Sequence, residues 1–113
     1  MFEIDGVRAT CYICADANAP RCIQRAKNLR PQVVFWPVNA CTHDPTWLRD
    51  MMAAHARAIG APVLMANRIG DSWAWKGGNG GAAVYSAAGE LLAGANCEGK
   101  EEILIYDLEI GPR

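Results

Sequence analysis

The sequence predicts a layered α/β domain with the element order β-α-β-α-β, followed by a β-hairpin and a final strand. Three observations lead to this prediction. Short apolar runs typical of strands alternate with segments in which apolar residues recur at helical spacing. Proline, glycine and aspartate stand at the boundaries between these segments. The chain has 113 residues, of which 51% are hydrophobic, so we expect residues 1–113 to fold as a single domain with its own core.

The first strand, helix and second strand follow one another closely. Residues 7–13 suit a strand, and Pro20 then stands near the first turn of a helix that Pro31 stops. The apolar residues of this helix recur at helical spacing: Ile23, Ala26 and Leu29. Residues 33–36 form a continuous apolar run, as expected for a strand that is covered on both faces.

The second helix has the clearest boundaries. Asp44 can cap its N-terminus, Pro45 suits the first helical position, and Gly60 ends it. One face of this helix is apolar apart from a histidine: Trp47, Leu48, Met51, Met52, His55 and Ile59. On this face we expect His55 to be a packed, hydrogen-bonded core histidine.

The C-terminal half of the chain is predicted to consist mainly of strands. In order, we expect a strand, a loop, a hairpin and a last strand: residues 63–66, 67–81, 82–85 with 90–93, and 103–108. The loop is rich in glycine and contains Trp73 and Trp75, and the hairpin turns at Ala88 and Gly89.

Composition excludes several classes of function. The net charge is −1 and the charges are interspersed, which gives no basis for binding nucleic acid or an anionic membrane surface. No apolar run is long enough to span a bilayer, and the acidic N-terminus does not resemble a signal peptide. Five cysteines without a secretory signal favour reduced thiols, most of them buried as small hydrophobic residues. We therefore expect a soluble, cytoplasmic protein without a cofactor.

The most informative local feature is a cysteine at the end of the first predicted strand. Cys14 stands where an extended stretch passes abruptly into a helix start. A thiol at such a corner is exposed at the end of the sheet, and backbone N–H groups of the next turn point toward it. This arrangement suits a nucleophile and can bind an oxyanion. Asp16, just past the corner, can cap the helix start or pair with Arg25.

These residues resemble the nucleophile segment of the carbon–nitrogen hydrolase (nitrilase-like) superfamily. The positions that match at the family's spacing are Gly6, Ile13, Cys14, Asp16, Pro20 and Arg25. Further along the chain, matches continue in the family's order at Val33, Val34, Pro37, Arg57, Ala58, Val63, 67–70, Gly80, Gly81, 89–93 and Asp107. Because the matches extend along nearly the whole chain, the resemblance is specific.

The resemblance implies a fold and a chemistry. The fold is a partial nitrilase-like α-β-β-α sandwich, of which the chain is the C-terminal portion. Cys14 is the implied nucleophile and the backbone N–H of Ala15 the implied oxyanion donor. Such enzymes hydrolyse small amides, nitriles or carbamoyl compounds through a thioester on the cysteine.

Two further groups of the family, a glutamate base and a lysine, lie well upstream of the nucleophile. Only thirteen residues precede Cys14, none of them a lysine, and Glu3 is too near the start of the strand to be that base. We therefore expect the N-terminal half with both groups to be absent, and the chain alone to be weak or inactive. It is expected to form a homo-oligomer or to need a complementing chain.

Strand ends and loops indicate a substrate pocket. Trp36, Asn39 and Asn67 lie where such a pocket is expected to form.

Two alternatives remain open. The Cys11-x-x-Cys14 spacing, with Cys22, Cys41 and His43, also occurs in redox and zinc proteins. Cys11 and Cys14 would, however, point to opposite faces of a strand, and no metal is predicted. The second alternative is a non-catalytic assembly module or degenerate paralogue, because half of a two-sheet sandwich leaves an apolar sheet face uncovered.

Overall fold

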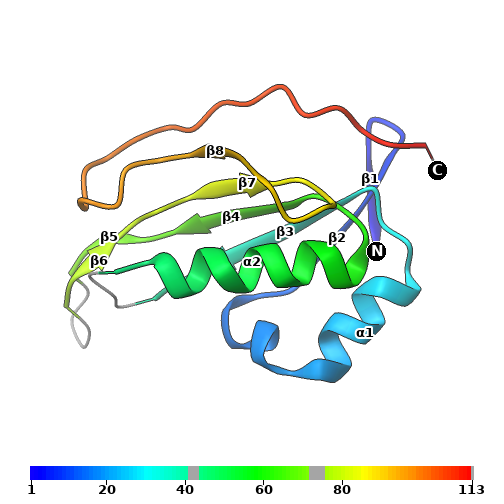
Figure 1. Ribbon diagram of the computed structural model, residues 1–113, viewed down its shortest axis with the longest axis horizontal. Helices are drawn as coiled ribbons and strands as arrows, with labels where there is room; N and C mark the ends of the chain where they lie inside the picture. The colour runs from blue at the N-terminus through cyan, green and yellow to red at the C-terminus, as the bar shows by residue number, and fades with distance from the viewer. Residues whose placement is uncertain (41–43, 72–75, 113) are drawn as a thin grey trace.

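A computed structural model describes residues 1–40, 44–71 and 76–112 of the chain (Figure 1). Its main element is a six-stranded sheet with the strand order β1-β2-β3-β4-β7-β8. These strands are β1 (Phe2–Ile4), β2 (Val7–Cys11), β3 (Val33–Val38), β4 (Val63–Asn67), β7 (Ala83–Tyr85) and β8 (Leu91–Gly94). The three central strands β2, β3 and β4 are parallel, and the other neighbours are antiparallel. The predicted α/β class is confirmed.

The helices lie together on one side of this sheet (Figure 1). A short 3₁₀ helix, η1 (Cys14–Asn18), follows β2 and leads into α1 (Pro20–Asn28), and α2 (Thr46–Ile59) connects β3 to β4. Among the described residues, neither helix is long and apolar enough to cross a membrane.

The boundaries of α2 agree with the local signals. The Asp44 carboxylate accepts a hydrogen bond from the Thr46 N–H at 2.9 Å, so it satisfies the first N–H of the helix from one position before the N-cap, where the sequence had predicted it to be the cap itself. Pro45 is the N-cap residue rather than the first helical residue. Gly60 ends the helix with φ 78°, a left-handed conformation that glycine adopts without steric cost.

The two faces of the sheet differ. Residues of β3 and β4 that point toward α2, such as Val34 and Met65, are buried and belong to the hydrophobic core. Their neighbours on the opposite face, such as Phe35 and Leu64, are only half-buried and lie outside that core. Neither described α-helix covers this second face (Figure 1), which is called the open face below.

Two parts of the sequence-based prediction missed strands. β1 pairs with β2 across a turn at Asp5 and Gly6, both of which have positive φ. An Asp-Gly pair is a strong signal for such a hairpin, and the prediction did not use it. The predicted loop 67–81 contains a short pair of strands, β5 (Ile69–Gly70) and β6 (Gly78–Asn79). Trp73 and Trp75 lie outside the described residues.

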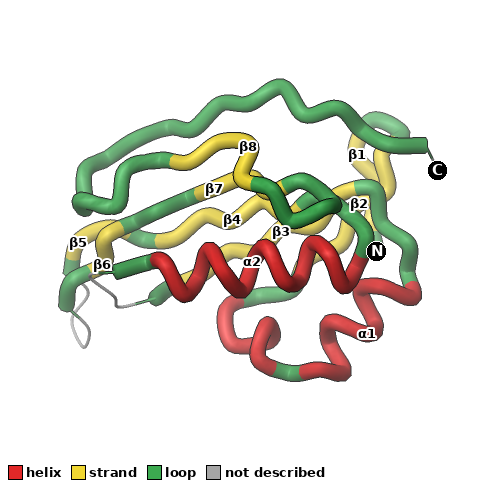
Figure 2. The backbone as a smooth tube through the Cα atoms, viewed as in Figure 1, coloured by secondary structure: helices red, strands yellow, loops and turns green. Residues whose placement is uncertain are grey.

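The predicted last strand, residues 103–108, is wrong. This segment is extended but forms no strand, and it runs beyond β8 at the edge of the fold (Figure 2). A turn held by the Asn96 side chain, which binds the backbone of Glu98 and Lys100, leads the chain away from β8. A run of apolar residues such as this one forms a strand only when the edge of a partner strand lies within hydrogen-bonding distance. Consequently Ile103 and Ile105 are 88% and 84% exposed.

Candidate active site

Cys14 has an unusual backbone conformation at the point where the sequence predicts a nucleophile. β2 ends at Cys11, two residues earlier than predicted, and Cys14 is the first residue of η1 with φ 48°. Positive φ in a residue other than glycine costs about 1–3 kcal/mol and is concentrated at functional sites. Asp5 and Arg30 share it, but they lie in a hairpin turn and just after α1, where left-handed residues are common.

Hydrogen bonds on both sides hold this corner in place. The Ile13 N–H donates to Asp16 Oδ2 at 3.1 Å, and the Asp16 N–H donates to the Ile13 carbonyl at 3.0 Å. Asp16 therefore caps η1, as predicted, and no ion pair joins it to Arg25 among the described residues. On the other side, the Trp36 indole N–H donates to the Cys14 carbonyl at 3.0 Å.

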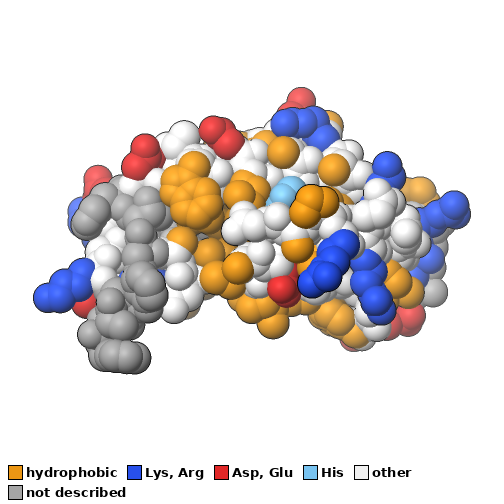
Figure 3. Space-filling model, turned by 90° about the horizontal axis from the view of Figure 1, so that it is seen from below, with side chains coloured by type: hydrophobic (Ala, Val, Ile, Leu, Met, Phe, Trp, Pro, Cys, Tyr) orange, Lys and Arg blue, Asp and Glu red, His pale blue; other side chains and the backbone are white. Residues whose placement is uncertain are grey.

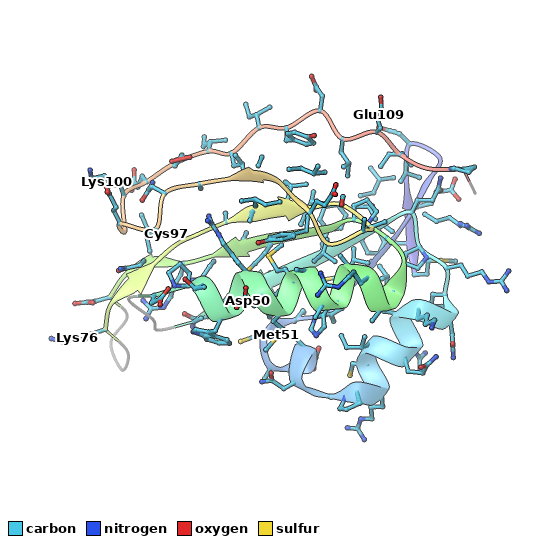
Figure 4. All side chains as sticks on the ribbon, viewed as in Figure 1. Asp50, Met51, Lys76, Cys97, Lys100 and Glu109 are labelled. Carbon is cyan, nitrogen blue, oxygen red and sulfur yellow. The ribbon has the colours of Figure 1, made fainter. Side chains whose placement is uncertain are left out.

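A cavity of about 240 Å³ opens beside Cys14. Its lining comes from η1, the end of β3 and the first half of α2, and includes Cys14, Ala15, Asn18, Trp36, Asn39, Trp47 and Met51. Met51 lies on the side of α2 that faces η1 (Figure 4). The volume suits a small compound rather than a polymer.

Two of the three predicted pocket residues line this cavity together with Cys14. Asn39 is exposed, whereas Trp36 is only 2% exposed. Asn67 lines a different cavity. Its side chain accepts a hydrogen bond from the Ala40 N–H and donates one to the Gly80 carbonyl, both at 2.9 Å. Asn67 thus fixes the backbone next to Asn39.

The sequence analysis did not include Asn18, Trp47 and Met51 in the pocket. The sequence pattern places Trp47 on the apolar face of α2, but its side chain is 50% exposed. The helical side of the molecule presents hydrophobic side chains across its middle (Figure 3). Trp47 and Met51 are one helical turn apart and flank the fully buried stripe that contains Leu48 and Met52. That spacing is the signal that could have identified them.

Behind the cavity, His55 belongs to an aromatic cluster. Its Nδ1 lies 3.0 Å from the Tyr12 hydroxyl, and its ring centroid lies 5.9 Å from that of Trp36. Burial lowers the pKa of His55, and a hydrogen bond to the backbone of Ala17 acts in the opposite direction. Burial, with a smaller contribution from Cys11, raises the pKa of Tyr12. His55 is thus a packed, hydrogen-bonded histidine, as predicted, and it does not line the cavity.

The other thiols are separate from Cys14. Cys11 is exposed and lines another cavity, and burial followed by the charge of Asp16 raises its pKa. Among residues 1–40, 44–71 and 76–112, no three His, Cys, Asp or Glu side chains form a group that could hold a metal ion. Cys41 and His43 lie outside these ranges. The expectation that most cysteines are buried is wrong for the four described ones, since Cys14, Cys22 and Cys97 are only half-buried.

Solved structures resemble this chain closely in fold. A CN-hydrolase superfamily protein from Xanthomonas campestris, with an arsenic adduct in its active site, matches 88% of the chain with a TM-score of 0.76 and 16% identity. A glutamine-dependent NAD+ synthetase from Acinetobacter baumannii matches 89% with a TM-score of 0.80 and 18% identity. An amidase from Nesterenkonia sp. AN1 matches 86% with a TM-score of 0.75 and 22% identity.

The chain has part of a nitrilase-like fold. It spans 40%, 19% and 36% of these three proteins, respectively. No protein-family model matches the sequence, and no curated protein matches it. The identities are low, so the likeness establishes the architecture and not the reaction. The predicted partial nitrilase-like fold is confirmed.

Proposed function

We propose that Cys14 is the nucleophile of a carbon–nitrogen hydrolase site for a small amide, nitrile or carbamoyl compound. The observation that carries this proposal is the placement of Cys14. The thiol-bearing residue begins η1 in a left-handed conformation and lines a cavity of about 240 Å³. A mutant of the Nesterenkonia amidase carries the acetamide moiety of fluoroacetamide on its active site cysteine, which is the kind of adduct that we expect on Cys14.

For an amide, the proposed reaction runs through a thioester. The Cys14 sulfur attacks the carbonyl carbon, a C–S bond forms, and the carbonyl oxygen becomes an oxyanion. The C–N bond then breaks, and the amine leaves with the proton that the thiol gave up. Water attacks the thioester, releases the acid and restores the thiol. The Ala15 N–H is available for the oxyanion, because a helix leaves its first N–H groups without an intrahelical partner.

Among the residues that the structure describes, the lining of the cavity offers no group that could act as the base. None of its described lining residues is an acid, a lysine or a histidine. Glu3 lies in β1 and does not line it. Losing the glutamate base and the lysine that helps to stabilise the oxyanion costs orders of magnitude in rate, even with the Ala15 N–H in place, so we expect very low turnover from the chain alone. The missing glutamate and lysine would come from the N-terminal half of the fold on a complementing chain.

The open face favours association with another chain, whether the assembly is an enzyme or a non-catalytic module. Phe35, Pro37, Leu64 and Ala66 form an apolar surface on β3 and β4 that is half-buried or exposed. A complementing chain or a second copy would cover this surface, and a non-catalytic assembly module would use it too. The four described cysteines are free, which suits a reducing compartment such as the cytoplasm.

The test is selective labelling of the cysteines. We expect fluoroacetamide or iodoacetamide to modify Cys14 faster than Cys22, which is also free and half-buried, as measured by peptide mass. Cys14→Ser should abolish the fast phase and Cys22→Ser should leave it unchanged. Equal rates at Cys14 and Cys22 would leave Cys14 as a structural residue. If zinc protects Cys11 and Cys14 together, the metal alternative replaces this proposal.

A further inference from the structure

We propose that Trp36 is a positioning residue that aims the Ala15 N–H and holds Cys14 in its left-handed conformation. This inference rests on the proposed function, because the direction of the Ala15 N–H matters only if Cys14 is the nucleophile. It concerns a side chain that lines the cavity and also hydrogen-bonds to the backbone of the nucleophile.

The first step of the argument is the geometry of one peptide group. The Cys14 carbonyl and the Ala15 N–H belong to the same planar trans peptide, in which the C=O and N–H point in opposite directions. The Trp36 indole N–H donates to that carbonyl at 3.0 Å. By fixing the carbonyl, this hydrogen bond also fixes the direction of the N–H on the other side of the plane.

The second step concerns the strained rotation at Cys14. The φ and ψ of Cys14 together set how the peptide that follows it is turned relative to the peptide that precedes it, so holding both peptides restricts φ as well. The preceding peptide is held because the Ile13 carbonyl accepts a hydrogen bond from the Asp16 N–H at 3.0 Å. The following peptide is held by Trp36. These two hydrogen bonds together maintain a φ of 48°, which an unrestrained cysteine rarely adopts.

The third step is the rigidity of Trp36 itself. It belongs to β3, is 2% exposed, and packs against the rings of Tyr12 and His55 at centroid distances of 6.0 and 5.9 Å. Tyr12 and His55 are in turn joined by a hydrogen bond of 3.0 Å. An indole that is enclosed in this way has few alternative rotamers and little surface for substrate. Its polar N–H is the part that acts on the site.

The test compares two reactions of Cys14 in the whole chain. Acylation by p-nitrophenyl acetate develops an oxyanion, whereas alkylation by iodoacetamide does not. We expect Trp36→Phe, which keeps an aromatic ring but removes the N–H, to lower the ratio of acylation rate to alkylation rate about tenfold. Complete removal of an oxyanion donor costs about 10²–10³ in rate, and misdirecting one should cost less.

The matched control is Tyr12→Phe, which removes a hydrogen bond from the same cluster but leaves the Trp36–Cys14 bond in place. This variant should keep the ratio within about twofold of wild type. The hydrogen bond that it removes contributes to the stability of the cluster but does not set the direction of the Ala15 N–H. An equal fall in both variants, or no fall in Trp36→Phe, overturns the inference. If wild-type Cys14 is not acylated faster than Cys22, the proposed function fails as well.

A measurement on the wild-type chain keeps the inference testable if Trp36→Phe does not fold. Hydrogen exchange followed by NMR should show slow exchange of the Trp36 indole proton, because that N–H is buried and hydrogen-bonded. Exchange at the rate of an exposed indole would overturn the inference.

Discussion

Neighbouring residues in β4 face two different environments. Met65 points toward α2, is 4% exposed and belongs to the core, whereas Leu64, the preceding residue, points to the open face and is only half-buried. The same contrast occurs in β3 between Trp36 and Phe35. The difference teaches that the hydrophobic core lies mainly on the helical side, while the open face leaves large apolar side chains only half-buried.

The largest effect expected from this contrast is on the free energy of unfolding when a side chain on either face of β4 is truncated. Met65→Ala should lower the free energy of unfolding by about 2–5 kcal/mol, because it leaves a cavity in a closed core. Leu64→Ala should cost about 1 kcal/mol or less, because its side chain is already half in water. Urea denaturation of both variants measures the difference. Similar costs would mean that the open face is covered in solution.

A smaller effect is expected from pH, through the helical side alone. The pKa of His55 is lowered in the folded protein from its ordinary value of 6.5. Between the folded pKa and 6.5 the unfolded chain binds more protons, so stability rises with pH in that window. The contribution is present above 6.5 and is lost as the pH falls through the folded pKa.

Urea denaturation near pH 7.5 and near pH 5.5 checks this prediction. The wild-type chain should lose more stability on acidification than His55→Gln, which retains His43 and so isolates the effect of His55. Equal losses in the two proteins would show that His55 titrates alike in the folded and unfolded states.

A substitution on the open face should have the smallest effect on stability but a clear effect on the self-association of the chain. Ala66→Lys places a charge on an exposed position and should change the free energy of unfolding by less than about 0.5 kcal/mol. It should also weaken self-association of the chain in sedimentation velocity. A Glu101→Lys variant, changed in the exposed C-terminal segment, is the control. A wild-type chain that stays monomeric at high concentration contradicts the assembly role of the open face.

Sequence reasoning predicted elements whose boundaries are set locally. Asp44 and Gly60 define α2, Pro20 begins α1, and the turn at Gly89 lies between β7 and β8. Residues 103–108 have an equally good strand pattern, but their pairing depends on a distant partner edge. No local pattern shows that the Asn96 turn leads them away from β8.

The candidate site divides in the same way. The corner at Cys14 and its cap at Asp16 were predictable, because the signals lie within a few residues of each other. The bond from Trp36 was not, because its partner is 22 positions away in sequence. Asn67 was recognised as part of a motif, but its bonds to Ala40 and Gly80 depend on how three separate segments meet.

The left-handed backbone at Cys14 also has a consequence for protein engineering. A glycine would adopt a φ of 48° without the steric cost that a cysteine bears. A procedure that optimises stability alone would therefore replace this residue and in the same step remove the sulfur. At position 14, selection for folding stability and selection for a reactive thiol would therefore favour different amino acids.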